Sequence, residues 1–194
     1  PDLRIVVMSA TATLDWVGQM TGRKVPELDA EATAFVAAHG PAAAPVFLPC
    51  LSGIRTPWNR PDMTGRVTGL HPGVTPAMLA YATMEGVAFQ FADCVAAQQE
   101  VGARPERFTV VRGGTRSRLW LRLLSTALDR PVSLIDGADI AGPRGAARLA
   151  AVAAGAPASV LGEPIAPTGL VSPEMALAEA IAPRREAMRA MMMS

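Results

Sequence analysis

A long apolar helix with a well-defined start is the strongest structural signal in this chain. Thr75 and Pro76 open it, because a threonine N-cap accepts a hydrogen bond from the first turn and a proline in that turn sacrifices none. The residues that follow, up to about Glu100, are apolar on most sides, which predicts a helix that is buried in the fold. With 194 residues, half of them hydrophobic, the chain can build a packed core around it as one sizeable domain.

Strands and helices alternate in the second half of the chain. Phe108–Val111 has the pattern of a strand and leads through Gly113 and Gly114 into a helix. That helix places one set of apolar residues on a single face: Leu119, Trp120, Leu123, Leu124 and Ala127. A further strand is expected at Pro131–Ile135, and this alternation is typical of α/β layering with parallel strands.

Shorter patterns predict the remaining elements. The expected strands and helices are a strand at Leu3–Val7, a helix containing Leu14 and Trp16, a helix at Leu28–His39, strands at Pro45–Leu48 and Val67–Leu70, a helix at Gly145–Ala154, and a helix at Pro173–Ser194 broken near Pro183. The Ala/Gly/Pro-rich run at 141–169 is compatible with a flexible or irregular connection and equally with a helix plus loops.

Composition argues against several classes of protein. A net charge of +1, with basic residues scattered singly, argues against nucleic acid as a partner. No run approaches the roughly 18 apolar residues of a membrane span, and no leader pattern is visible. Cys50 and Cys94 have neither metal-ligand nor disulfide-framework spacing, and Cys94 is expected to be a small buried hydrophobe. This cysteine usage leads us to expect a cytoplasmic, reduced protein. His39 and His71 have no ligand partners in sequence, so no metal-ligand site is expected in this chain.

The Gly113-Gly114 turn is the best physical candidate for a ligand site. Glycines let a ligand approach the backbone, and the following helix begins with unpaired N–H groups. Alone, however, a glycine pair between a strand and a helix is more often a tight turn without a ligand.

The order of motifs from Phe47 to Phe89 resembles the FGGY family of carbohydrate kinases, and most closely its xylulose-kinase-like members. The positions that match the second family signature are Gly65, Val67, Gly69, Leu70, Leu79, Ala82, Thr83, Met84 and Glu85, with Met78 in place of a polar residue. The loop Ser52–Pro57 resembles the family's SGERTP with Ile54 in place of glutamate, and Gly142–Leu149 resembles its GxALGAAxLA helix. Glu85, inside an apolar helix, is expected to be a satisfied structural carboxylate and not a catalytic base.

The resemblance also assigns a nucleotide site. Gly113, Gly114, Thr115, Arg116, Ser117 and Trp120 match a GGGA-(K/R)-S-x-x-W run whose backbone lines the adenosine pocket, although Arg112 replaces a glycine and Thr115 an alanine. The segment from Ser9 to Trp16 resembles SAAGSLxW, near ribose and phosphates, and makes Thr11, Thr13 and Asp15 polar candidates; Ala12 replaces its glycine.

These matches imply the C-terminal domain of an ATP- and Mg²⁺-dependent sugar kinase, with an actin-like ATPase (RNase H-like) fold. They imply that residues 1–194 form this single domain without its first strands, and that xylulose is the expected sugar. The DNAA-type segment with the catalytic aspartate has no counterpart here. We therefore expect no catalytic residue in this chain, no activity from it alone, and an N-terminal kinase lobe as its partner, in the same or a separate chain.

Three hypotheses stay open. The chain is part of a longer kinase, a free-standing nucleotide- or partner-binding module without catalysis, or a structural remnant of a kinase. The departures at Ala12, Ile54, Met78 and Arg112 are compatible with the last of these. Formation of a homodimer is left open as well.

Overall fold

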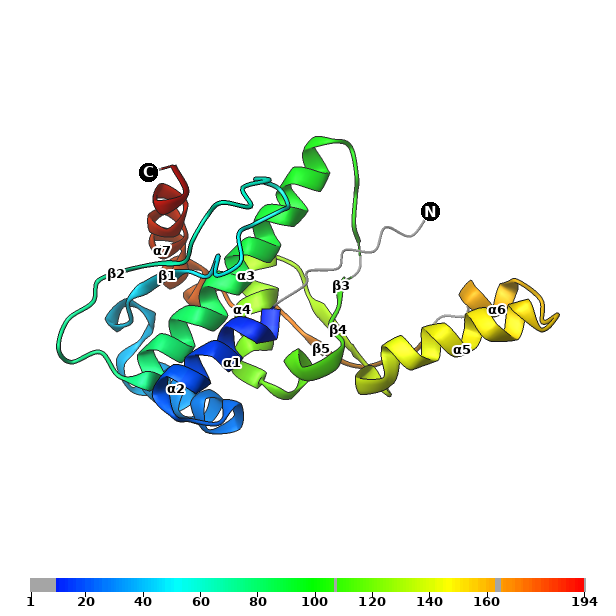
Figure 1. Cartoon of the computed structure of the whole chain (residues 1–194), viewed down its shortest axis with the longest axis horizontal. Helices are drawn as coiled ribbons and strands as arrows, with labels where there is room; N and C mark the ends of the chain where they lie inside the picture. The colour runs from blue at the N-terminus through cyan, green and yellow to red at the C-terminus, as the bar shows by residue number, and fades with distance from the viewer. Residues whose placement is uncertain (1–9, 107, 163–164, 194) are drawn as a thin grey trace.

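A helical body, two small sheets and a projecting helical arm make up the described part of the molecule (Figure 1). The computed structural model describes residues 10–106, 108–162 and 165–193, so the strand expected at Leu3–Val7 lies outside the described residues. The body consists of α1 (Ala10–Thr21), α2 (Val25–His39) and α7 (Met175–Met193) around the central helix α3 (Pro76–Glu100).

The central helix α3 has the expected bounds. Its N-cap Thr75 accepts a hydrogen bond from the Met78 N–H at 3.3 Å, and its buried residues lie on all sides. A Cβ added at Gly86 would collide with the carbonyl oxygen of Phe47, so glycine is required where α3 crosses the first strand. Local signals thus place the start of α3, and contacts with the surrounding elements bury it.

Helix α2 begins three residues earlier than the sequence predicted. Pro26 occupies its first turn, and the Glu27 carboxylate accepts a hydrogen bond from the Lys24 N–H at 3.1 Å. Both features stabilise an earlier start, because proline suits the first turn and the carboxylate caps an otherwise unpaired N–H.

The described strands form two separate sheets. β1 (Val46–Leu48) pairs antiparallel with β2 (Arg66–Thr68). The second sheet has the order β3-β4-β5, from β3 (Phe108–Thr109), β4 (Val132–Ile135) and β5 (Pro167–Val171). β3 and β4 pair in parallel across helix α4 (Arg118–Leu128), as expected, whereas β5 is antiparallel to β4. The prediction of parallel pairing is therefore correct for the β3–α4–β4 unit, and β5 is an additional, antiparallel strand that was not predicted.

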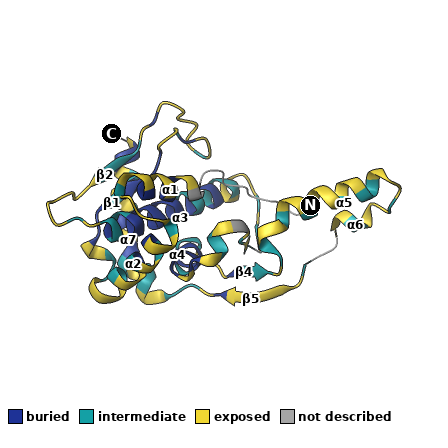
Figure 2. Cartoon of the chain, turned by 60° about the horizontal axis from the view of Figure 1, so that its bottom comes forward, coloured by how far each residue is buried: buried dark blue, intermediate teal, exposed yellow. Residues whose placement is uncertain are grey.

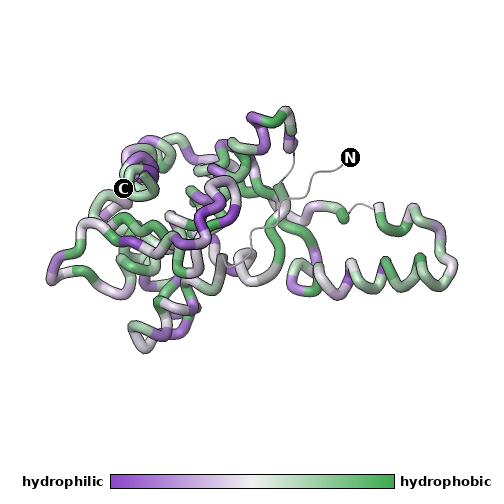
Figure 3. The backbone as a smooth tube through the Cα atoms, turned by 45° about the horizontal axis from the view of Figure 1, so that its top comes forward, coloured by the Kyte–Doolittle hydropathy of each residue, from purple (hydrophilic) through white to green (hydrophobic). Residues whose placement is uncertain are grey.

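The segment after β4 forms an arm that projects from the body. It contains a short 3₁₀ turn, η3 (Ala138–Ile140), then α5 (Ala141–Ala153) and α6 (Ser159–Gly162), and these three elements have no buried residue (Figure 2). Hydrophobic residues nevertheless continue along the arm (Figure 3), and Leu149 is 63% exposed. Of the two readings of the 141–169 run, the structure has helices plus loops, with β5 beginning inside it.

The C-terminal helix α7 is continuous, which corrects the predicted break near Pro183. Proline removes one hydrogen bond within a helix and crowds the preceding turn. Here the buried side chains lie on both sides of it, at Ile181 before and at Arg184, Met188, Met191 and Met192 after. Packing of these residues against α3, α4 and β1 holds the helix together across the proline.

Candidate functional site

The predicted nucleotide loop is a short 3₁₀ turn between β3 and α4. This turn, η2 (Arg112–Arg116), contains the exposed Gly113 and the half-buried Gly114 and Thr115. A Cβ built on Gly114 would lie 3.6 Å from Val110 and 3.8 Å from the Trp120 ring, so the side chain of Trp120 supports the loop from below. The indole N–H of Trp120 is buried and has no hydrogen-bond partner among the described residues.

Ser117 joins this loop to helix α4. Its hydroxyl accepts a hydrogen bond from the Trp120 N–H at 3.0 Å, which makes Ser117 the N-cap of α4. The same hydroxyl donates to Oδ1 of Asp29 on α2. The start of α4 is therefore held by a side chain that is distant in the sequence.

Arg116 points away from the loop toward the arm. Its guanidinium lies 3.1 Å from the Asp139 carboxylate on η3, and both side chains are more than half exposed. An exposed pair of this kind contributes at most about 1 kcal/mol. It orients the arginine at the edge of the loop without fixing the loop itself.

The second set of predicted site residues lies on α1. Thr13 is buried and Asp15 is exposed, while Thr11 belongs to the helix but its side chain lies outside what the structure describes. Helix α1 packs on α3 and α2, whereas η2 packs on α4 and η3. Among the described residues, no hydrogen bond or ion pair joins Thr13 or Asp15 to the loop. The two parts of the predicted site are therefore not linked by such a bond between these residues.

A metal ion has no ready-made position in the part of the chain that the structure covers. In residues 10–106, 108–162 and 165–193, no three His, Cys, Asp or Glu side chains are grouped so that they could hold one. Any Mg²⁺ at this site would have to rely on ligands other than such a cluster, as with the phosphates of a nucleotide.

Glu85 has the structural environment expected from the sequence. Its carboxylate accepts hydrogen bonds from the Arg184 guanidinium at 2.7–3.0 Å and from the Tyr81 hydroxyl at 3.0 Å, and it is almost completely buried. Burial raises the pKa of Glu85, and the Arg184 cation offsets part of that rise. Burial also raises the pKa of Tyr81 well above its usual value near 10. The carboxylate is saturated with donors, which argues against a role as a base.

Sequence reasoning missed the arginines of α7 as partners of α3. Besides the Arg184 pair, Asp93 on α3 accepts hydrogen bonds from Arg185 at 2.7 Å and from Arg189 at 2.6 Å. The sequence signal was an Arg-Arg pair after Pro183 in a helix with buried methionines, but nothing local identifies acidic partners about 90 residues away.

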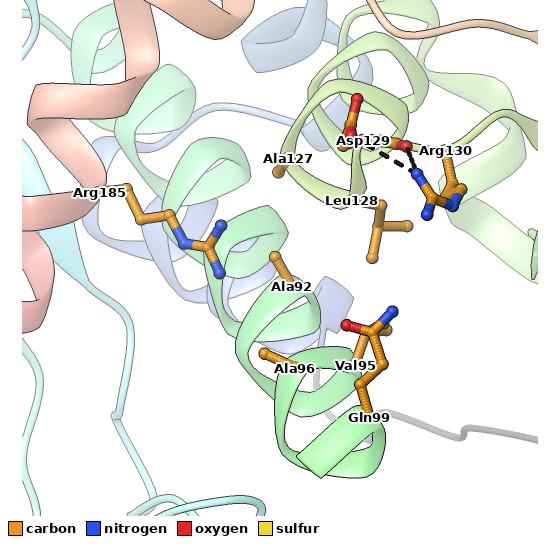
Figure 4. A pocket seen from close by; sticks show the side chains of 9 residues that line it. All are labelled: Ala92, Val95, Ala96, Gln99, Ala127, Leu128, Asp129, Arg130 and Arg185. Carbon is orange, nitrogen blue, oxygen red and sulfur yellow. Dashed lines mark hydrogen bonds and ion pairs between the residues drawn. The ribbon is translucent and has the colours of Figure 1, made fainter. Parts of the chain in front are cut away.

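A hollow of about 230 Å³ lies between α3 and α4, at the opposite end of α4 from the loop (Figure 4). Its floor includes Ala92, Ala96, Ala127 and Leu128, and the guanidinium groups of Arg130 and Arg185 lie toward opposite sides of it. Asp93 already binds Arg185, and the Asp129 carbonyl oxygen accepts from Arg130 at 2.7 Å. This hollow does not coincide with the predicted nucleotide loop, and the loop remains the better chemical candidate because it combines exposed backbone with a helix N-terminus.

The C-terminal domain of the FGGY family of carbohydrate kinases matches residues 6–154, which include α1, the central helix and the loop. The chain belongs to the FGGY family of carbohydrate kinases. The actin-like (RNase H-like) fold class expected from the sequence is thereby confirmed.

Relatives and solved structures agree with the FGGY assignment. The chain is 38% identical over 154 residues to a xylulose kinase of Escherichia coli K12, covering 78% of this chain and 31% of that protein. A glycerol kinase of Geobacter sp. M21 is 32% identical over 127 residues, covering 65% of this chain and 25% of the other. The crystal structure of a xyloylose kinase from Brucella ovis superposes with a TM-score of 0.80 at 32% identity, covering 93% of this chain and 37% of that one. The chain thus spans about a third of the length of these FGGY kinases.

None of the helices described in this FGGY domain is long and apolar enough to span a bilayer.

Proposed function

We propose that this chain is the nucleotide-binding half of an ATP-dependent sugar kinase that phosphorylates a pentulose, with xylulose as the favoured substrate. The observation that carries the proposal is the 38% identity to a xylulose kinase across most of the chain. Glycerol kinases are also among the relatives, at lower identity, so the choice of sugar rests on this difference.

The loop 113–117 is proposed to contact the adenosine part of ATP. Gly113 is exposed, and no side chain of its own shields the backbone there. Helix α4 follows directly and is 11 residues long, so its first N–H groups and its dipole favour an anionic or hydrogen-bond-accepting ligand. Thr11, Thr13 and Asp15 on α1 are proposed as the ribose and phosphate side of the same site.

The proposed sources of the metal and of the catalytic base lie outside the loop. Mg²⁺ is proposed to arrive with the phosphates of ATP, because Mg²⁺ is commonly held by one or two carboxylates together with substrate phosphates. Its contribution would be to neutralise charge that develops during phosphoryl transfer. The aspartate that accepts the proton of the sugar hydroxyl is proposed to belong to an N-terminal kinase lobe, in the same chain or another.

A chimeric enzyme tests this proposal. The N-terminal lobe of the E. coli xylulose kinase would be joined to this chain in place of that enzyme's own matching part, and ADP release would be measured with xylulose and with glycerol. We expect ADP release that depends on xylulose, and no phosphorylation by the 194-residue chain alone.

Two results would contradict the proposal. A folded chimera that prefers glycerol overturns the assignment of the sugar. A folded chimera that binds ATP but phosphorylates neither compound favours the alternative, a nucleotide-binding module without catalysis.

A further inference from the structure

Asp29 on α2 is in hydrogen-bond contact with the start of α4. In the described residues, the Ser117 hydroxyl and Oδ1 of Asp29 form the one hydrogen bond or ion pair that joins these two elements, across 88 positions of sequence. Asp29 is partly buried and carries no second described partner on its other carboxylate oxygen. The bond is therefore a specific link between two elements that are distant in the sequence.

The chemistry of this pair fixes the orientation of the serine hydroxyl. The Trp120 N–H can only donate, so the Ser117 oxygen accepts from it. An ionised carboxylate can only accept, so the single hydroxyl proton of Ser117 points to Asp29. Hydrogen bonds to an ionised acceptor are stronger than neutral ones and polarise the hydroxyl oxygen, which makes it a better cap for Trp120.

The packing of α2 and α4 indicates that loss of the Asp29–Ser117 hydrogen bond would have a local effect. Helix α2 packs mainly on α3, with smaller contacts to α1 and to the 3₁₀ turn η1 (Pro41–Ala43). Helix α4 packs on α3, α7, β4 and β5. Because the larger contacts of both helices are with other elements, loss of the Asp29 carboxylate should disturb the loop and the first turn of α4 without unfolding the core.

We propose that Asp29 is a positioning residue for the nucleotide loop. It holds the Ser117 hydroxyl, Ser117 caps α4, and the cap fixes Gly113 and Gly114 above Trp120 in the conformation that would receive adenosine. This inference rests on the proposed function for the identity of the ligand, but the positioning itself is a property of the free protein.

Amide hydrogen exchange in the absence of nucleotide tests the positioning. In Asp29→Ala, exchange of the amides of residues 113–121 should rise about 5- to 10-fold, the factor that corresponds to losing an N-cap worth about 1 kcal/mol. Asp29→Asn retains an acceptor oxygen and should restore part of the protection. Glu31→Ala, which removes a partly buried carboxylate of the same helix paired with Arg23 at 3.6 Å, is the matched control and should leave these amides unchanged.

The double variant Asp29→Ala/Ser117→Ala separates positioning from general loosening. It should exchange no faster at 118–121 than Ser117→Ala alone, because Asp29 acts through that hydroxyl. Unchanged exchange at 113–121 in Asp29→Ala, or equal loss of protection throughout α3, would overturn the inference.

Calorimetric titration with ATP on the same variants adds the functional readout. If wild type binds ATP, Asp29→Ala should bind about 5- to 10-fold more weakly and Asp29→Asn should lie between them. Unchanged affinity in Asp29→Ala would overturn the inference. If wild type itself shows no binding, the proposed function fails, and the positioning role stands or falls on the exchange data.

Discussion

Removal of the Arg184 side chain should destabilise this protein more than any other single truncation on α7. Arg184 donates to both oxygens of Glu85 at 2.7–3.0 Å and to the carbonyl oxygens of Ala44 and Pro45 at 2.8 and 2.9 Å. In Arg184→Met the buried carboxylate keeps only the Tyr81 hydroxyl as a described partner. Breaking one side of a buried ion pair costs about 3–5 kcal/mol, a large part of the roughly 5–15 kcal/mol of a typical domain.

The destabilisation should depend on pH with a defined sign. Burial already raises the pKa of Glu85, and loss of the Arg184 cation removes the interaction that lowers it. A carboxyl whose pKa is higher in the folded than in the unfolded state destabilises the fold most at high pH, where it is ionised in both states. This loss of folding free energy disappears as the pH falls toward the unfolded pKa near 4.5. The gap between Arg184→Met and wild type should therefore narrow between about pH 8 and about pH 5.

Urea unfolding followed by circular dichroism at both pH values measures this effect. Arg118→Met, which removes an exposed arginine with no hydrogen-bond partner described, is the control and should change the free energy of unfolding by at most about 0.5 kcal/mol. The double variant Glu85→Leu/Arg184→Met should recover at least half of the loss, because it leaves no uncompensated charge. A loss below about 1 kcal/mol in Arg184→Met, or a loss that is the same at both pH values, would refute the reasoning.

Three further predictions follow from single contacts. The Arg122 guanidinium lowers the pKa of Glu174 below its usual value near 4.5. Because the Glu174 side chain is 40% exposed, Glu174→Gln should lower the free energy of unfolding by only about 0.5 kcal/mol at neutral pH, and by nothing once the pH falls through the folded pKa. Urea titrations at neutral pH and at a pH below that pKa check this. Burial raises the pKa of Cys50 and Cys94, so both thiols should react slowly with a disulfide reagent at pH 8 and become reactive in urea; fast reaction in the native state would contradict the packing. Gly86→Ala should lower the thermal midpoint, because its Cβ meets a backbone carbonyl of β1 that cannot move away, and an unchanged midpoint would show that α3 and β1 can separate.

Local chemistry explains which elements could be predicted from the sequence. The Thr75-Pro76 start defines α3, and the apolar spacing from Leu119 onward defines α4. The continuity of α7 could not be predicted, because Pro183 is a helix breaker by local rules and the Arg184–Glu85 pair that holds the helix spans 99 positions. β5 lacked a signal too, since its Pro-Thr-Gly start lies inside an Ala/Gly/Pro-rich run.

The candidate site also has a part that could be predicted from the sequence and a part that could not. The Gly113-Gly114 turn follows from the sequence, because a strand, a turn and a helix in succession specify it locally. The link to Asp29 could not be inferred, because no local pattern on α2 distinguishes that carboxylate from Glu27 or Glu31.

Calorimetric titration of the chain with ATP, in wild type and Gly113→Phe, tests most directly the claim that the loop binds nucleotide. Gly113 is exposed, and a phenylalanine there would fill the space proposed for adenosine. Gly162→Phe, at a glycine with no neighbouring atoms within 4 Å, is the matched control. The account predicts saturable binding by wild type and the control, and loss of binding in Gly113→Phe. Equal binding by all three proteins, or none by wild type, would contradict it.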